Sequence, residues 1–507
     1  MSDMFSAIRA RMPASDTVFL TTPEGRRMSY GDVLLESARM AGALVASGVG
    51  PGDRVALQVD KSPEATLVYL ACLRAGAVFL PLNTAYTLTE LDYFLGDAEP
   101  ALVICRPAIA AEVAALAIKR GVKFCLTLGA KGEGSLMDLV ARQSESFADV
   151  PRRGDDLAAF LYTSGTTGRS KAAMLTHDNL ASNAQVLTEY WRFTGKDVLL
   201  HALPIFHTHG LFVATNVVLF AGASMIFLAK FDADQVLALL PKATALMGVP
   251  TFYTRLLDHP GLTQAATAHM RLFVSGSAPL LAETHRAFAQ RTGHAILERY
   301  GMTETGMIAS NPYDGERIPG TVGFPLPGIE VRIADPDSGR ALGTDEVGVI
   351  ELRGPNVFKG YWRMPEKTKA EFRPDGFFVT GDVAKRDARG YIHIIGRAKD
   401  LVISGGYNVY PIEIEGEIDA LPGIVESAVI GLAHPDFGEG VTAVAIRAKD
   451  AAIDEAQVLK ALDGRLAKYK QPKRVLFVDE LPRNAMGKVQ KNLLRERFKD
   501  LYAKPGG

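Results

Sequence analysis

Short apolar runs alternate with helix-length segments along roughly the first 300 residues. The strand-type runs lie at 54–58, 79–82, 101–105 and 123–127, and two of the helix-length segments lie at 62–74 and 108–120. Strands that alternate with helices build parallel sheets with helices on both faces. We therefore expect an α/β fold with doubly wound sheets.

The pattern changes after residue 311. Up to residue 396 the runs are short and β-rich, with Gly, Pro and Asp between them, which predicts a small β-barrel or sandwich. A charged pentapeptide at 396–400 then precedes a new alternation of strands and helices. We expect an N-terminal domain at 1–396 with a β-rich subdomain at 311–396, a hinge at 397–400, and a small α+β domain at 401–507.

One stretch has the length of a membrane span. Residues 211–229 contain no charged side chain. However, Ala-Gly-Ala at 221–223 separates a helix-type half from a strand-type half, and Asn216 adds a polar group. We interpret the stretch as a buried helix, turn and strand.

Composition and charge exclude several classes of protein. The chain has 507 residues, 48% of them hydrophobic, and a formal net charge of −1, which gives no overall attraction for nucleic acid or an anionic membrane. Cys72, Cys105 and Cys125 lack the paired spacing of a disulfide framework or a zinc site. The first twenty residues lack the apolar core of a secretory signal. We expect a cytoplasmic enzyme.

A glycine-rich loop follows the apolar run at 157–161. Residues 162–171 read YTSGTTGRSK, with five Ser or Thr and one lysine. Glycines let backbone N–H groups approach an anion, and the hydroxyl and ammonium groups add donors. The loop predicts binding of a nucleotide polyphosphate, although its spacing differs from the common ATPase pattern and a Ser/Thr-rich turn is the alternative.

A second group of polar residues reads ERYGMTE at 298–304. Tyr300 offers a stacking face for a base, Thr303 can donate to a phosphate, and Glu304 can bind Mg²⁺, which takes carboxylate and phosphate oxygens together. A helix cap is the alternative. Upstream, the small residues of SGSA at 275–278 leave room for a flat ligand near the backbone.

Further candidates lie toward the C-terminus. Asp382 follows a strand and can accept hydrogen bonds from ribose hydroxyls, with Arg397 beside the linker, although a turn aspartate is the simpler interpretation. Lys488 follows a glycine turn and would by itself be a surface charge. Residues 465–499 nevertheless hold eleven Lys or Arg against three Asp or Glu, so we expect anionic ligands there.

Together and in this order, these segments resemble the adenylate-forming acyl-CoA synthetase and luciferase superfamily over essentially the whole chain. The resemblance implies that a carboxylic acid and ATP form an acyl-adenylate, which coenzyme A then converts to a thioester, with Mg²⁺ as cofactor. It implies phosphate contacts from Thr163, Ser164, Gly165, Thr166, Thr167 and Lys171. It implies contacts to the rest of the nucleotide from Gly276, Ser277, Ala278, Glu298, Arg299, Tyr300, Gly301, Thr303, Asp382 and Arg397.

The resemblance also implies roles in catalysis and domain movement. Lys488, Thr303, Glu304 and His207 would be catalytic, with Glu304 as the Mg²⁺ ligand and Lys488 also contacting ATP. The C-terminal domain would turn about Asp400 between the two steps and bring Ser404, Gly405 and Gly406 to the coenzyme A thiol. A lysine acyltransferase acting on Lys488 would stop the first step.

The resemblance further implies that the acid is malonate, and we expect methylmalonate as a further substrate. A dicarboxylate needs a cation at its far end, because burying an unpaired carboxylate is costly. Arg286 is the candidate, on a helix expected at 282–292, with His207, Ser277 and Met302 as further contacts and His209 nearby. Periodicity alone favours an exposed helix arginine, whereas the family resemblance favours the pocket.

Three other interpretations remain open. The acid could be another small or aryl carboxylate. The chain could be a nucleotide sensor without turnover, but the presence of Lys488 and Glu304 argues against this. The basic region at 465–499 could bind nucleic acid, but ATP and coenzyme A explain it better, so we expect neither nucleic acid nor membrane as partner.

Overall fold

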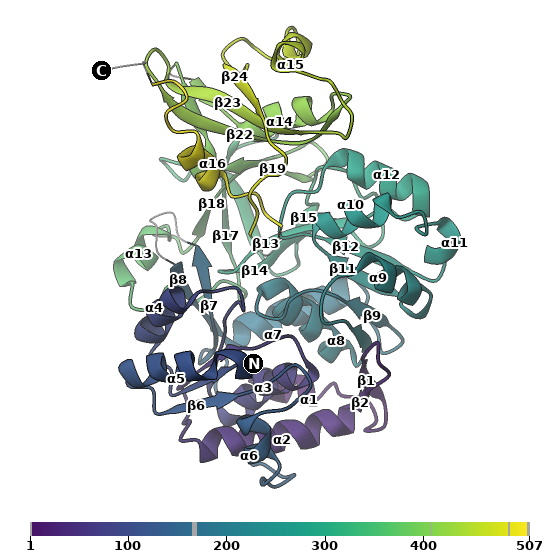
Figure 1. Cartoon of the computed structure of the whole chain (residues 1–507), viewed down its shortest axis with the longest axis vertical. Coiled ribbons are helices and arrows are strands. Elements are labelled where there is room, and N and C mark those ends of the chain that lie inside the picture. The colour runs from purple at the N-terminus through teal and green to yellow at the C-terminus, as the bar shows by residue number, and fades with distance from the viewer. Residues whose placement is uncertain (1–2, 165–169, 406, 485–486, 504–507) are drawn as a thin grey trace.

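The computed structural model describes residues 3–164, 170–405, 407–484 and 487–503. Figure 1 shows three tiers along the long axis, with the N-terminal residues at the base, the middle of the chain above them and the C-terminal domain at the top. The helices of the larger domain include α1 (Met4–Arg9), α2 (Tyr30–Ala46), α4 (Leu88–Ala98), α5 (Ala110–Lys119), α6 (Ser135–Val140), α9 (Ala233–Leu239), α11 (Gln264–Thr267) and α13 (Pro365–Ala370).

The first sheet has six strands in the order β6-β5-β3-β4-β7-β8. They are β3 (Arg54–Gln58), β4 (Val78–Pro81), β5 (Leu102–Cys105), β6 (Phe124–Thr127), β7 (Leu157–Ser164) and β8 (Ser170–Thr176). All neighbours pair in parallel except β8, which runs antiparallel to β7. Between β3 and β4 the chain forms α3 (Pro63–Ala75), whose residues are all buried.

The second sheet has nine strands in the order β15-β14-β13-β12-β11-β9-β10-β1-β2. They are β1 (Val18–Thr21), β2 (Arg27–Ser29), β9 (Val198–His201), β10 (Ser224–Phe227), β11 (Ala245–Gly248), β12 (Leu272–Ser275), β13 (Leu297–Met302), β14 (Gly306–Ser310) and β15 (Phe324–Pro325). The strands from β1 to β13 in this order are parallel, so their carboxyl ends share one edge, where open α/β sheets bind ligands.

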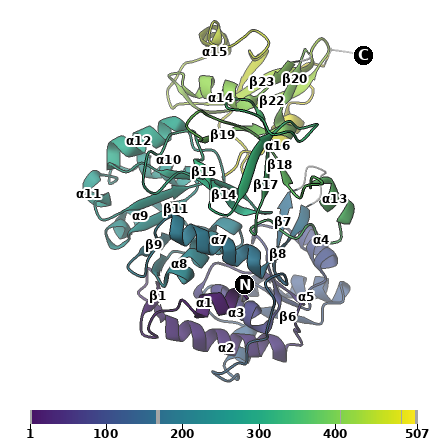
Figure 2. The same cartoon turned by 180° about the vertical axis from the view of Figure 1, so that it is seen from behind.

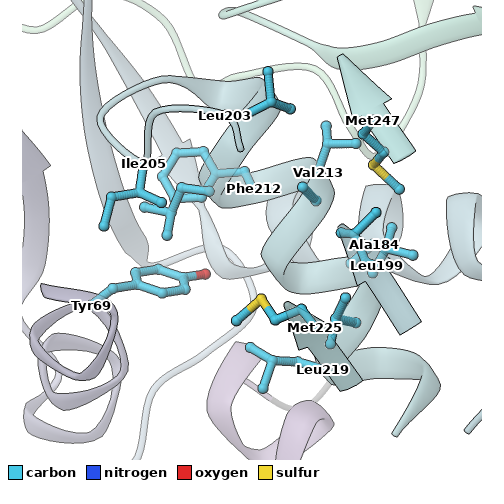
Figure 3. Packing of buried hydrophobic residues seen from close by; sticks show 14 of the residues in the cluster. Tyr69, Ala184, Leu199, Leu203, Ile205, Phe212, Val213, Leu219, Met225 and Met247 are labelled. Atoms are coloured by element: carbon cyan, nitrogen blue, oxygen red, sulfur yellow. The ribbon is translucent and has the colours of Figure 1, made fainter. Parts of the chain in front are cut away.

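The uncharged stretch at 211–229 is buried in the core. Residues His209–Thr215 form a π-helix that continues into α8 (Asn216–Ala221), and Gly222, at φ 63°, ends the helix before β10. Figure 3 shows Phe212 of the π-helix with Ile205 and Tyr69 in this core, where α7 (His177–Tyr190) also packs. Among the described residues, none of the helices is long and apolar enough to cross a bilayer.

The β-rich segment forms a four-stranded antiparallel sheet in the order β16-β17-β18-β19. Its strands are β16 (Glu330–Ala334), β17 (Gly348–Arg353), β18 (Phe378–Arg386) and β19 (Ile392–Arg397). The connection after β17 extends the first sheet, because Met174 N donates to Gly360 O at 2.9 Å and Trp362 N donates to Ala172 O at 2.9 Å. This contact brings the connection beside β8.

The C-terminal domain has its own sheet and core. It contains β20 (Val402–Ser404), β21 (Tyr407–Val409), α14 (Pro411–Asp419), β22 (Ile424–His434), β23 (Gly438–Arg447), α15 (Glu455–Leu462), β24 (Arg474–Phe477) and α16 (Lys491–Arg497). Figure 2 shows this domain above the larger one from behind. The two meet at Gly487, where an added Cβ would lie 3.3 Å from Thr251 of α10 (Pro250–Asp258).

Candidate functional site

A buried aspartate joins the second sheet to the β-rich sheet. Asp382 of β18 is opposite Arg397 of β19, and Arg397 Nε lies 2.6 Å from Asp382 Oδ1. The Tyr300 hydroxyl donates to the other carboxylate oxygen, and burial beside this carboxylate raises the Tyr300 pKa well above its usual value. Asp382 is thus fixed between a neutral phenol and a guanidinium, where it can accept hydrogen bonds from a ribose.

A second network surrounds the lysine of the glycine-rich loop. Lys171 is buried, with Nζ 4.2 Å from the Tyr361 ring centre and 3.6 Å from Glu371 Oε1. The Tyr361 hydroxyl lies 2.7 Å from Glu371 Oε2 and 2.9 Å from Glu304 Oε1. Burial raises the Glu304 pKa. The phosphate-loop lysine and the expected metal ligand are therefore connected through one tyrosine.

Lys488 lies on a tight turn of the C-terminal domain. Lys488 N donates to Asn484 Oδ1 at 3.0 Å, and Arg483 Nη1 donates to Gly487 O at 2.7 Å. Desolvation in the cleft, and to a lesser extent the charge of Arg397, lowers the pKa of the Lys488 ammonium to about 8. Lys488 itself is solvent-exposed, so its ammonium can reach a ligand in the cleft.

Arg299 is a buried cation that sequence reasoning assigned to the nucleotide. Successive strand side chains point to opposite faces, so Arg299 lies on the side away from Tyr300. It is 3% exposed, and neither Nε nor Nη2 has a hydrogen-bond partner within the described part of the chain. Burial lowers its pKa to about 9, so it stays charged at neutral pH. A Cβ on Gly276 would overlap the guanidinium, which explains the glycine.

Two histidines and a serine share this side of the site. His209 Nδ1 lies 3.2 Å from Ser277 Oγ, and His209 N donates to His207 Nδ1 at 3.3 Å. Burial, and to a lesser extent the nearby charge of Arg299, lowers the pKa of His207 to about 4. The same causes lower the pKa of His209 well below its usual value. Both imidazoles are neutral at pH 7, so Arg299 is the cation of this cluster.

The structure does not place Arg286 in this cluster. The helix expected at 282–292 forms as α12 (Ala282–Thr292), but Arg286 is exposed. The helix is oriented by Phe288, which packs on Phe273 and Tyr253 with ring centres 4.9 Å and 5.3 Å away, and by His285, whose Nε2 lies 2.9 Å from Ile296 O. Position 286 consequently faces solvent, and the assignment of Arg286 to the acid stays a prediction.

The remaining candidates are placed as follows. Glu298 is buried, accepts from Leu280 N at 3.3 Å, and has a pKa raised to about 8 by burial. Met302 ends β13 and Thr303 follows it in a turn, whereas Gly276 and Ala278 follow β12. Gly301 lets β14 approach closely, because a Cβ there would overlap Gly306 O. Ser404 and Gly405 lie at the turn between β20 and β21.

In the glycine-rich loop, Thr163 of β7 pairs with Lys171 of β8. Four of the candidates lie outside the described residues: Gly165, Thr166, Thr167 and Gly406.

Comparison with known proteins finds two family descriptions. "AMP-binding enzyme" matches residues 7–362, and "AMP-binding enzyme C-terminal domain" matches residues 413–488. The chain is 38% identical to a feruloyl-CoA synthase from Amycolatopsis sp, covering 97% of each chain. It is 36% identical to a malonate–CoA ligase from Arabidopsis thaliana, covering 89% of this chain and 78% of that one.

Solved structures of MatB from Rhodopseudomonas palustris are also similar, at 62% identity over 99% of this chain and 100% of theirs. The TM-score is 0.97 against the ATP-bound form and 0.85 against the apo form. Because identity and coverage are the same in both comparisons, the difference reports conformation. The present arrangement is closer to the ATP-bound form.

Proposed function

The chain belongs to the AMP-binding enzyme family, and from this premise we propose that it ligates malonate to coenzyme A through an acyl-adenylate, with cleavage of ATP to AMP and pyrophosphate. The relatives differ in the acid that their names state, feruloyl in one and malonate in another. The choice between such acids depends on the residues around Ser277, which include His207, His209 and Arg299.

Arg299 is the observation that carries the choice of malonate. Its guanidinium is buried with two unpartnered nitrogens among the described residues, beside two neutral histidines. An uncompensated buried charge costs several kcal/mol, about 3–5 when one partner of a pair is missing. The distal carboxylate of malonate would supply that partner in planar, bidentate geometry, whereas a feruloyl group carries no second charge. Methylmalonate should also bind, because one methyl discriminates by only about 1–3 kcal/mol.

In the first step, a malonate carboxylate oxygen attacks the α-phosphorus of ATP, and the bond to pyrophosphate breaks. Tyr300, Asp382 and Arg397 would fix the nucleoside, and the glycine-rich loop with Lys171 would hold the leaving phosphates. Lys488 and Thr303 would stabilise the negative charge that develops on the α-phosphate. Orientation and fixed charge account for most of such catalysis, and no protein nucleophile is needed.

In the second step, the coenzyme A sulfur attacks the acyl carbon, and AMP leaves with the electrons of the C–O bond. We propose that His207, a neutral imidazole at pH 7, accepts the thiol proton. The turn containing Ser404 and Gly405 would line the approach of the thiol after the C-terminal domain turns about Asp400.

Glu304 fits a Mg²⁺ ion. Its carboxylate is buried and has Tyr361 as its side-chain hydrogen-bond partner, and the described residues contain no cluster of three or more acidic, His or Cys ligands. One carboxylate together with substrate phosphates is a usual environment for Mg²⁺. The ion would neutralise phosphate charge when bound.

Two further proposals concern regulation and location. The lowered pKa of Lys488 increases the fraction of neutral amine, which supports a lysine acyltransferase as partner.

Cys72, Cys105 and Cys125 are free thiols, which supports a reducing, cytoplasmic location.

Pyrophosphate release across a panel of acids tests the function. Malonate and methylmalonate should be turned over, and ferulate, acetate and benzoate should be turned over poorly. Faster release with ferulate than with malonate would contradict the malonate assignment while leaving the enzyme class intact.

Arg299→Ala and Arg286→Ala form a matched pair that tests the pocket. We expect Arg299→Ala to lower malonate-dependent release by about 100-fold or more, since the distal carboxylate would be buried without a partner, while the KM for ATP stays within about twofold. Arg286→Ala should keep nearly full activity because its side chain is exposed. The reverse result would assign the distal carboxylate of malonate to Arg286.

A further inference from the structure

The turn that carries His207 and His209 leads directly into the π-helix at 209–215. Leu211 N donates to His207 O at 3.1 Å, so the turn is bonded to the start of the helix. Asn216 N donates to Leu211 O, five residues back, as the wide turns of a π-helix require. Because π-helices are rare and occur mostly at functional sites, the contacts that keep this one in place also bear on the two histidines.

Gly210 is the residue at which side chains from elsewhere hold this helix. A Cβ on Gly210 would overlap Pro204 O, so only glycine lets the helix approach the preceding segment this closely. The Gly210 carbonyl oxygen lies 2.8 Å from His201 Nε2 and accepts from Thr215 Oγ1 at 3.0 Å. Gly210 is thus fixed by a close backbone contact and by two side-chain hydrogen bonds.

The contacts of His201 determine which ring nitrogen carries the proton. A carbonyl oxygen only accepts hydrogen bonds, so Nε2 is the N–H that donates to Gly210 O. Burial lowers the pKa of His201 well below its usual value, so the ring is neutral and Nδ1 is an acceptor. Lys61 Nζ lies 2.9 Å from Nδ1 and also donates to His201 O at 2.8 Å. Lys61 therefore holds the ring in the tautomer and orientation that the bond to Gly210 requires.

Lys61 makes these contacts beside two buried aromatic rings. Its Nζ lies 4.2 Å from the Phe227 ring centre, and both Phe227 and His201 are buried. Burial lowers the pKa of the Lys61 ammonium well below its usual value. The neutral amine and the ammonium both carry N–H groups, so either form can make the two hydrogen bonds to His201. Moving an amine out of water is costly, so a contribution to stability is a poor explanation for a lysine here.

This series of contacts ends at the groups around Ser277. His209 Nδ1 lies 3.2 Å from Ser277 Oγ, and His209 N donates to His207 Nδ1 at 3.3 Å. Both histidines lie within three residues of Gly210. Figure 3 shows apolar side chains of the π-helix packed together with those of the segment before it. A displacement of the Gly210 carbonyl would therefore move the two imidazoles with it.

We propose that Lys61, His201 and Thr215 are positioning residues for recognition of the acid, acting through the Gly210 carbonyl on the turn at 207–209. The proposal rests on the proposed function, because it takes the groups around this turn to contact malonate. Lys61 orients the imidazole, and the imidazole and the Thr215 hydroxyl hold the carbonyl. Loss of one of these contacts should weaken binding of the acid and leave the nucleotide contacts intact, because those come from other elements.

Two substitutions of His201 test the proposal in malonate-dependent exchange of pyrophosphate into ATP, which requires no thiol. The amide of Gln can place an N–H close to the position of Nε2, whereas the shorter Asn falls short of Gly210 O. His201→Asn should raise the KM for malonate about tenfold, because small displacements of binding groups are costly. His201→Gln should keep most of the affinity for malonate, and the KM for ATP should stay unchanged in both variants.

His294→Asn is the matched control. His294 Nε2 also lies 3.0 Å from a carbonyl oxygen, that of Thr267. However, His294 precedes β13 and so lies at the amino end of the strand, away from the turn at 207–209. The KM for malonate should stay unchanged in this variant.

Thr215→Val and Lys61→Met test the other two contacts. Thr215→Val removes the second hydrogen bond to the carbonyl with little change in shape, and should raise the KM for malonate about threefold. Lys61→Met keeps the stem without a donor and should have an effect of similar size. Since His201 and Thr215 share one acceptor, the double variant should raise the KM by less than the product of the two single effects.

The outcomes separate positioning from damage to the fold. An unchanged KM for malonate in His201→Asn and Thr215→Val would overturn the proposal. Equal losses in His201→Asn and His201→Gln, or equal rises in the KM values for malonate and ATP, would also overturn it. Thr215→Val, the smallest change, decides the matter if His201→Asn does not fold. Absence of malonate-dependent exchange from the unmodified protein would instead refute the proposed function.

Discussion

At the scale of single residues, Arg299 is the buried charge that the proposed binding of malonate would neutralise. A guanidinium that is 3% exposed, with two unpartnered nitrogens among the described residues, pays a desolvation cost that the surrounding histidines do not offset. Such a cost is expected where a site is organised in advance for a charged group. The free protein and the malonate complex should therefore respond oppositely to loss of this charge.

Arg299→Met should stabilise the free protein while abolishing its response to malonate. Methionine fills part of the same volume without charge, and replacing buried ionic groups with apolar ones often stabilises by about 1–4 kcal/mol. Urea unfolding without ligand measures the first effect. The second is measured by whether added malonate raises the unfolding midpoint, as it should in the unmodified protein. A variant that is less stable yet still responds to malonate would contradict the role of Arg299.

The pKa of Lys488 predicts the alkaline limit of the first step. The ammonium is the form that stabilises a phosphate, and the cleft lowers its pKa to about 8, so protonation is lost as pH rises through that value. Pyrophosphate exchange should consequently fall above about pH 8. Lys488→Arg, which stays protonated at all these pH values, should show a lower rate and a flat alkaline limb. An unchanged alkaline limb in Lys488→Arg would assign the decline to another group.

At the scale of elements, the hydrophobic pattern predicted where helices and strands lie along the chain better than which way their side chains face. The helix at 282–292 and the strand at 54–58 appear with the expected bounds, because they depend on local periodicity. The π-helix at His209–Thr215 had no such signal. The side of α12 that Arg286 occupies depends on the contacts of Phe288 with two other elements. The sequence of one helix does not contain this information. Likewise, only the assembled sheets show that Tyr361 connects Lys171 with Glu304.

Tyr361→Phe should weaken the use of Mg·ATP without affecting the acid. The substitution keeps the ring 4.2 Å from Lys171 Nζ but removes the hydroxyl that contacts Glu304 and Glu371. Hydrogen bonds to charged groups contribute about 1.5–3 kcal/mol, so the KM for ATP should rise about tenfold or more. Exchange measured over a range of Mg²⁺ and ATP concentrations tests this. Unchanged dependence on both would limit Tyr361 to packing.

At the scale of the whole molecule, the position of the C-terminal domain connects the two steps. The domain brings the Lys488 turn against Thr251 of the large domain, and the TM-scores associate this arrangement with an ATP-bound form. Asp400, the proposed hinge residue between the domains, forms an ion pair with Arg495 of α16 at 2.7 Å and is thereby attached to the smaller domain. The present arrangement is therefore the one that we propose for adenylation.

Lys488→Ala separates the two steps and so tests whether the domain alternates. In the present arrangement Lys488 lies near Asp382 and Arg397, where it would stabilise the first step. If the domain turns about Asp400 for the second step, Lys488 leaves the site and its removal no longer matters. The variant should lose malonate-dependent pyrophosphate exchange by orders of magnitude, yet form thioester from supplied malonyl-adenylate and coenzyme A at nearly the original rate. Asp400→Pro, which restricts the hinge, should show the opposite defect. Equal loss of both steps in Lys488→Ala would mean that one fixed arrangement performs the whole reaction.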